Sequence, residues 1–112
     1  MSFRDLDVLD AAERLAERIN ALVDGADDFL HAAQVRRSAA GIGANISEGF
    51  GRREGADRKY RLEIARGEAE ETISWLRSNY TSNRITSGQY WPIHNLLVTI
   101  VKMLTALIKR RC

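Results

Sequence analysis

One stretch of the sequence decides the fold: IHNLLVTIVKMLTALI, residues 93–108. Beyond its first two residues, polar side chains recur only as one narrow stripe at helical spacing, namely Asn95, Thr99, Lys102 and Thr105. A helix in an isolated bundle needs an apolar stripe of roughly 100°, and this helix has a much wider one. The pattern therefore predicts a core helix with surplus apolar surface, which further copies of the chain would cover.

The outward side of this helix is the predicted subunit interface. A membrane is the rival explanation for so much apolar surface, but Lys102 interrupts the run. A basic cluster at residues 109–111 then closes the run before it is long enough to span a bilayer. We therefore predict a homo-oligomer and no membrane contact. The residues expected at the interface are Leu97, Val101, Leu104 and Ile108.

The helix around this stretch is predicted to cover residues 87–110. Thr86 and Gln89 have the spacing of a capping box at its start. Pro92 falls beyond the first turn of such a helix, where proline disrupts the backbone hydrogen bonds. The helix therefore either bends at the proline or begins later, near Trp91.

Three further segments show the apolar spacing of three and four residues that is typical of helices, at about residues 7–24, 28–49 and 56–80. Asp27 or Asp28 is placed to cap the second of them. A single proline and only 7% aromatic side chains disfavour a β-sandwich. The sequence therefore predicts an all-α protein. We expect a single domain over residues 1–112 that contains these four helices.

The composition is that of a globular protein, with 45% hydrophobic and 29% charged residues. The one cysteine, Cys112, cannot form an internal disulfide and is predicted to be an exposed thiol. The first residues lack the basic and apolar regions of a signal peptide. The expected location is therefore the cytoplasm.

The net charge is only +2, but residues 1–28 carry −5 and residues 29–112 carry +7. Basic residues gather at a glycine-rich turn, residues 49–55, and at the start of the next helix, where they can bind phosphates without reading sequence. The alternative is a solvated surface whose cations pair with neighbouring carboxylates, in an oligomeric scaffold that binds another protein. The residues predicted to bind nucleic acid are Arg36, Arg37, Arg52, Arg53, Arg58, Lys59, Arg61 and Arg66.

Two motifs resemble those of a known family. Residues 37–52, RSAAGIGANISEGFGR, are similar to the signature of small four-helix proteins encoded in intervening sequences of bacterial 23S ribosomal RNA, with Ser47 in place of alanine. Residues 60–67, YRLEIARG, resemble the family's third-helix motif, with Glu71 at its acidic position and Glu68 in place of the usual serine. The signature positions singled out are Asn45, Glu48, Gly49, Gly51 and Glu71.

The resemblance implies an antiparallel up-down four-helix bundle that commonly assembles into a ring of five subunits. A related branch contains the accessory variability proteins of diversity-generating retroelements, which are basic rings that bind nucleic acid and a reverse transcriptase. The partners implied are therefore nucleic acid and a reverse transcriptase or another protein. For most of the family the resemblance implies no biochemical activity, so it predicts fold better than function.

Two interpretations are open for the polar signature residues. In the structural one, Asn45 hydrogen-bonds across helices, Glu48 accepts from Arg37, Arg52 or the backbone, and Glu71 forms an interhelical salt bridge. In the functional one, Asn45 and Glu48 contact a ligand, and Glu71 is a catalytic base.

No enzyme chemistry is predicted. Di-iron four-helix proteins need two Glu-x-x-His pairs, and here only His31 has a carboxylate three residues earlier, that of Asp28. The sequence contains neither a phosphate-binding glycine loop after a strand nor a nucleophile motif. We therefore expect no catalytic residue, no metal and no cofactor.

Overall fold

The protein is an all-α chain of four long helices. The structure, a computed structural model, describes the backbone of residues 3–111 and the side chains of residues 7–110, so Cys112 lies outside it. The helices are α1 (Phe3–Gly25), α2 (Ala32–Phe50), α3 (Ala56–Thr81) and α4 (Ser87–Arg111), with no strand among the described residues. The predicted all-α class with four helices is therefore confirmed.

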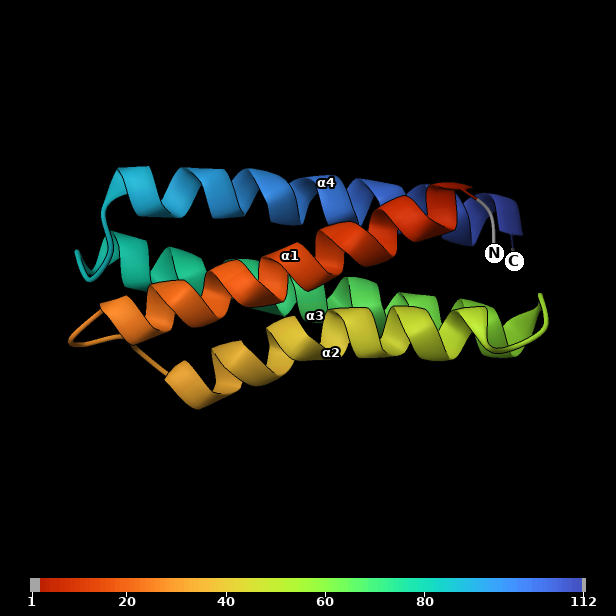
Figure 1. Cartoon of the computed structure of the whole chain (residues 1–112), viewed down its shortest axis with the longest axis horizontal. Helices are drawn as coiled ribbons and strands as arrows, with labels where there is room; N and C mark the ends of the chain where they lie inside the picture. The colour runs from red at the N-terminus through yellow and green to blue at the C-terminus, as the bar shows by residue number, and fades with distance from the viewer. Residues whose placement is uncertain (1–2, 112) are drawn as a thin grey trace.

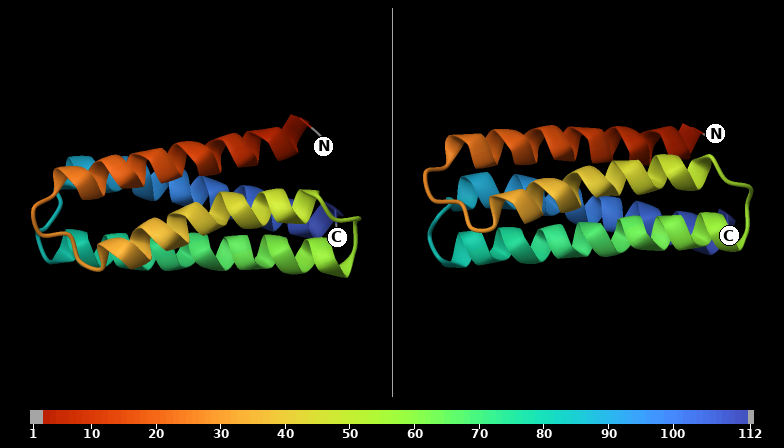
Figure 2. Two further views of the ribbon diagram at one scale, coloured as in Figure 1. Left: turned by 60° about the horizontal axis from the view of Figure 1, so that its bottom comes forward. Right: turned by 90° about the horizontal axis from the view of Figure 1, so that it is seen from below.

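The four helices lie side by side in a narrow bundle of 43 × 21 × 19 Å. Each helix runs opposite to the one before it, as Figure 1 shows. α1 and α3 each pack against both α2 and α4. The α2–α3 turn, the start of α1 and the end of α4 share one end of the bundle, and the other two turns lie at the opposite end (Figure 2).

A polar clamp sets the start of α2. The prediction that Asp27 or Asp28 caps this helix is wrong, because α2 begins at Ala32, after His31 in the left-handed conformation (φ 54°). The buried amide of Asn79 in α3 holds the preceding turn, since Oδ1 accepts from the Leu30 N–H at 2.7 Å and Nδ2 donates to the Leu30 carbonyl at 3.3 Å. This distant side chain replaces a local cap.

The apolar spacing of α3 predicts Tyr80 as its last inward residue, but the buried residue is Asn79, and Tyr80 is half-buried. Its other inward positions follow the apolar spacing. One buried polar contact joins α3 to α2, where the hydroxyls of Ser38 and Thr72 lie 2.8 Å apart. The buried residues of α3 are Leu62, Ala65, Ala69, Thr72, Leu76 and Asn79.

The start of α4 is capped as predicted. The Thr86 N–H donates to Gln89 Oε1 at 2.8 Å, and the Gln89 N–H donates to Thr86 Oγ1 at 3.2 Å. The helix therefore begins at Ser87 with Pro92 inside it, and the later start near Trp91 is wrong. The reciprocal cap satisfies two backbone groups that a helix start leaves without partners.

The outward face of α4 differs from the predicted interface. Leu97 and Leu104 are fully buried inside the subunit, so they cannot meet a neighbouring copy, whereas Val101 and Ile108 are half-buried. The error arose because the spacing of these residues defines one side of the helix without saying which side the subunit covers.

α4 is also long and apolar enough over Ser87–Arg110 to cross a membrane, judged by length and composition alone. The argument that Lys102 and the closing cations exclude a span is therefore too strong. The inward residues of α4 nevertheless form part of the core shared with the other helices, as expected of a core helix in a globular protein.

Candidate nucleic-acid interface

The α2–α3 turn is hydrogen-bonded by one of the predicted phosphate ligands. Arg58 reaches back from α3 and donates to the carbonyls of Gly49 (3.2 Å), Phe50 (3.4 Å) and Arg52 (2.7 Å). Its side chain is only 14% exposed and lies 3.8 Å from Glu54. Arg58 therefore satisfies carbonyls that the end of α2 leaves without helical partners. The sequence analysis predicted that Arg58 binds phosphates, but these carbonyls already occupy its guanidinium.

The turn needs glycine at one position. Gly55 precedes α3 with φ 131°, a conformation that side-chain-bearing residues rarely adopt. The hydrogen bonds of Arg58 and the backbone conformation of Gly55 together set the direction in which the turn presents Arg52 and Arg53. Both arginines are exposed.

Arg52 is exposed but already has an anionic partner. It forms an ion pair with Glu48, one turn earlier, at 2.5 Å. The hydrogen bond from Arg52 and then its charge lower the pKa of the Glu48 carboxyl below its ordinary value. Glu48 therefore behaves as the structural interpretation expects.

Three of the predicted ligands lie away from the turn. Arg36 pairs with Asp24 of α1 and donates to Asn20 Oδ1 at 3.1 Å. Arg66 donates to Thr105 Oγ1 of α4 at 3.2 Å. Arg37 is exposed near the middle of α2, where its charge acts on Glu68. The structure therefore does not bring the eight predicted cations together, because helices about 30 Å long separate them along the bundle.

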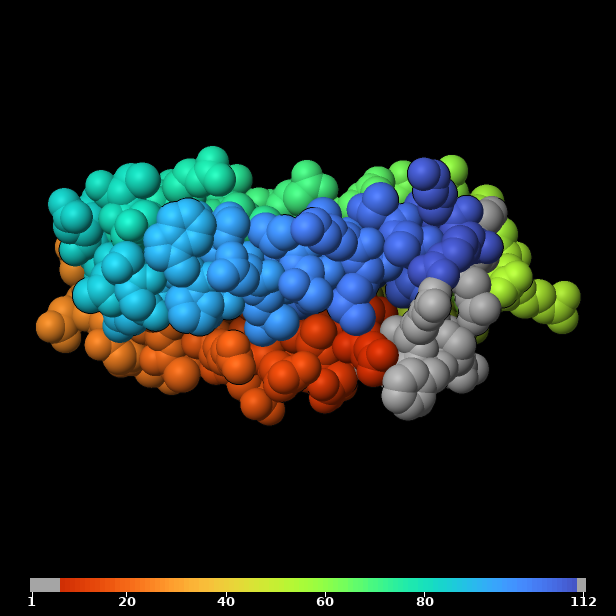
Figure 3. Space-filling model, turned by 90° about the horizontal axis from the view of Figure 1, so that it is seen from above, coloured from red at the N-terminus to blue at the C-terminus, as the bar shows by residue number. Residues whose placement is uncertain are grey.

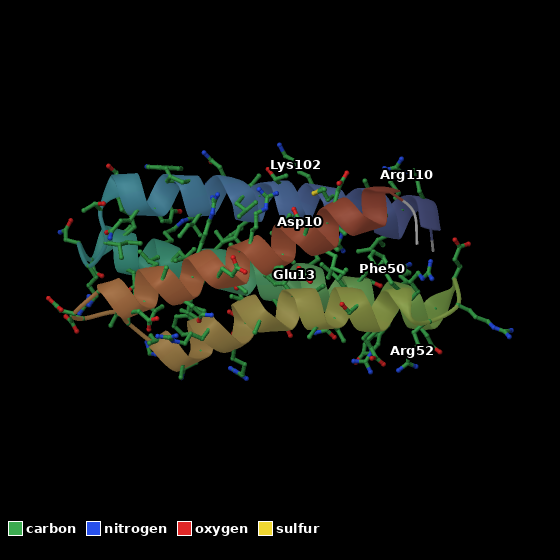
Figure 4. All side chains as sticks on the ribbon, viewed as in Figure 1. Asp10, Glu13, Phe50, Arg52, Lys102 and Arg110 are labelled. Carbon is green, nitrogen blue, oxygen red and sulfur yellow. The ribbon has the colours of Figure 1, made fainter. Side chains whose placement is uncertain are left out.

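The cations that do share one end of the bundle include two that the sequence analysis did not assign. Lys109 and Arg110 close α4, and α4 ends beside the α2–α3 turn. Figure 4 shows Arg52 and Arg110 at this same end, on different sides of it. We call this surface the basic end, formed by Arg52, Arg53, Lys59, Arg61, Lys109 and Arg110. The signal was the basic cluster that closes the fourth helical pattern, but only the fold places it beside the turn.

Acidic side chains also lie around the basic end. Asp57 and Glu63 are exposed on the first turns of α3, and Asp7 of α1 lines a groove of about 300 Å³ with Arg110. Within the described residues, Arg53, Lys59 and Lys109 form no ion pair with any of them. These three cations remain available to an external anion.

The signature residues form a polar seam between α2 and α3. Asn45 Nδ2 donates to the Gly41 carbonyl of its own helix at 3.0 Å and to Glu68 Oε1 at 3.3 Å, and its Oδ1 accepts from Arg61 at 3.5 Å. Close approach explains Gly49, because a Cβ there would lie 3.3 Å from side-chain atoms of α3. Asn45 thus contacts across helices, as its structural interpretation predicts.

Glu71 does not form the interhelical salt bridge that was predicted. It lies on the exposed side of α3, where its carboxylate accepts a hydrogen bond from Trp75 Nε1 of the same helix at 3.5 Å. The negative charge of Glu71 acts on the carboxyl group of Glu68. Burial raises the pKa of the Glu68 carboxyl, the charge of Glu71 raises it further, and Arg37 opposes both.

Comparison with known proteins agrees with the motifs in this seam. The family model described as "23S rRNA-intervening sequence protein" matches residues 4–106. The chain belongs to this family. A solved structure from Bacteroides thetaiotaomicron, a protein of unknown function from the S23 ribosomal protein family, is similar, with 36% sequence identity and a TM-score of 0.88. The similarity covers 96% of this chain and 99% of that one. No curated protein matches.

In this member of the 23S rRNA-intervening sequence protein family, an acidic side chain of α3, that of Glu68, lies at the seam with α2. Oε2 of Glu68 is buried without a hydrogen-bond partner, in the space that a side chain at Gly41 would fill. A desolvated, half-satisfied carboxylate destabilises the fold.

We expect Glu68→Gln to raise the melting temperature by a few degrees at pH 7. The folded-state pKa is raised, so the folded protein binds the proton more tightly than the unfolded chain, and stability from this group falls as pH rises above its ordinary pKa of 4.5. The gain should therefore shrink as the pH is lowered toward 4. Thermal unfolding at both pH values measures it, with exposed Glu63→Gln as the matched control. An equal gain at both pH values would contradict the assignment.

The two histidines lie against aromatic side chains. Among the side chains of residues 7–110, no group of three or more histidines, cysteines, aspartates or glutamates is placed to hold a metal. His31 lies against Trp75, with ring centroids 4.4 Å apart, and His94 lies against Tyr90 and Trp91. Both histidines are therefore occupied in packing at the end of the bundle opposite the basic end.

Proposed function

We propose that this family member is a non-enzymatic, cytoplasmic protein that binds RNA or DNA with low sequence specificity through its basic end. The observation that carries the proposal is a set of cations at one end of the bundle, Arg53, Lys59 and Lys109, that are exposed and form no ion pair with a carboxylate of the described residues. Lysine and arginine neutralise phosphates and release condensed counterions, so such a surface binds nucleic acid in a salt-dependent way.

The shape of this surface favours binding without sequence readout. The three cations lie on a turn, a helix start and a helix end, and Arg53 is exposed on the turn. None of these elements projects a recognition helix that could enter a major groove. Contacts to phosphates position a ligand but carry no sequence information.

We further propose that several copies assemble, five if the resemblance extends to subunit number. A groove of about 440 Å³ between α3 and α4 has a half-buried apolar floor of Ile73, Val98 and Val101, with Arg66 and Glu70 at its rim. Figure 3 looks onto α4, which lies between α3 and α1 on this face. A second copy that covers this floor would account for the surplus apolar surface, and a ring would multiply the charge of each basic end. A reverse transcriptase or another nucleic-acid enzyme is the protein partner that we propose by resemblance.

The triple variant Arg53→Ala/Lys59→Ala/Lys109→Ala tests the basic end. We expect it to bind a short RNA or DNA roughly tenfold or more weakly than the unaltered protein at low salt, because three phosphate contacts are lost. The control is Arg36→Ala/Arg77→Ala, which removes two cations at the opposite end of the bundle. Fluorescence anisotropy measures both affinities. Equal losses in the two variants would contradict this site, and no binding at low salt would instead favour the oligomeric scaffold.

A further inference from the structure

Tyr60 is an exposed aromatic side chain that the core does not explain. It is 62% exposed, more than the other exposed large apolar residue, Trp91, at 47%. Trp91 is held in an aromatic cluster, with its ring centroid 4.9 Å from that of Tyr90. The Tyr60 ring instead lies near a guanidinium, since Arg61 Cζ is 5.9 Å from the ring centroid.

The neighbours of Tyr60 place it between two cations on the outer side of α3. Arg61 lies toward α2, where it donates to Asn45 Oδ1. Lys59 lies one heptad before Arg66, which donates to Thr105 of α4, so Lys59 lies on the α4 side. Successive helical residues are about 100° apart, so these two cations flank the Tyr60 ring at the basic end.

Acidic residues limit how close a phosphate comes to the ring itself. Asp57 and Glu63 are exposed one turn before and one turn after Tyr60 on the same helix. A phosphate is therefore favoured beside Lys59, Arg53 or Arg61, while the space directly over the ring favours an uncharged, flat group. A nucleobase joined to a phosphate backbone has both parts.

We propose that Tyr60 is a stacking platform for an unpaired base, so that the basic end takes single-stranded rather than duplex nucleic acid. The inference rests on the proposed function, because the flanking cations must hold the backbone. A base inside a duplex has both faces covered by its neighbours and cannot stack on the ring, whereas an unpaired base can. The preference is independent of sequence because every base has a flat face.

The test compares a short oligothymidylate with a duplex of the same length, by fluorescence anisotropy at one low salt concentration. We expect Tyr60→Ala to weaken binding of the single strand roughly tenfold and to leave duplex binding unchanged, since stacking on an aromatic side chain contributes that order of affinity. Tyr60→Phe, which keeps the ring, should bind the single strand as the unaltered protein does. Circular dichroism checks folding, which an exposed side chain should not affect.

Other outcomes separate this inference from the function on which it rests. If Tyr60→Ala binds both ligands as the unaltered protein does, the stacking platform is wrong while phosphate binding stands. If the loss is the same for single strand and duplex, Tyr60 does not discriminate between them and the inference is also overturned. If the unaltered protein binds neither ligand, the proposed function itself fails.

Discussion

Leu104→Glu should abolish the fold of the subunit. Leu104 is fully buried on the inward face of α4, where it forms part of the common core. An unpaired carboxylate there costs several kcal/mol on top of the lost apolar contacts, and the total stability of a domain is only about 5–15 kcal/mol. We expect loss of helical circular dichroism or insoluble protein.

Val101→Glu, one helical turn earlier, is the matched variant. Val101 is half-buried at the floor of the α3–α4 groove, so a glutamate there can reach water without unfolding the subunit. We expect a folded protein whose native mass by light scattering falls toward that of a single chain. A folded Leu104→Glu variant would contradict the core assignment, and an unchanged native mass in Val101→Glu would contradict the interface.

Asn79→Ala should destabilise the protein by about 2–4 kcal/mol, because it removes a fully buried amide and leaves the partly buried N–H and carbonyl of Leu30 without their side-chain partner. The amide serves the N–H and carbonyl of Leu30 and also donates to the Trp75 carbonyl at 2.9 Å. Removing it frees the turn that precedes α2 and opens a small cavity beside α3.

Urea unfolding at a fixed protein concentration measures the effect of Asn79→Ala, with exposed Ser78→Ala as the control, because subunit association also contributes to apparent stability. A loss no greater than that of the control would show that the turn before α2 is held by other contacts.

Periodicity alone was sufficient to predict the four helices, because each has an apolar stripe with local spacing. The start of α2 could not be predicted this way, since the group that holds it, Asn79, is 49 positions away from Leu30 in the chain. The capping box at Thr86 and Gln89 was predictable because both partners are local. Local chemistry is visible in a sequence, whereas long-range hydrogen bonds require the fold.

In the candidate site, too, the sequence showed local features but not the long-range contacts. The sequence identified a basic turn, but it could not show that Arg58 is occupied by the carbonyls of that turn or that Arg36 pairs with α1. It also left out Lys109 and Arg110, which lie about 50 positions beyond the turn and join it only when α4 packs beside α3. The basic character of the site therefore stays a prediction, while the residues proposed for it differ from those that the sequence indicated.

Nucleic-acid binding at the basic end can be tested by the salt dependence of binding to a short single-stranded oligonucleotide. We expect log K to fall linearly as log salt concentration rises, and the slope of Arg53→Ala/Lys59→Ala/Lys109→Ala to be smaller by about one for each phosphate contact removed. An affinity that does not change with salt, or equal slopes for the variant and the unaltered protein, would contradict nucleic-acid binding at the basic end.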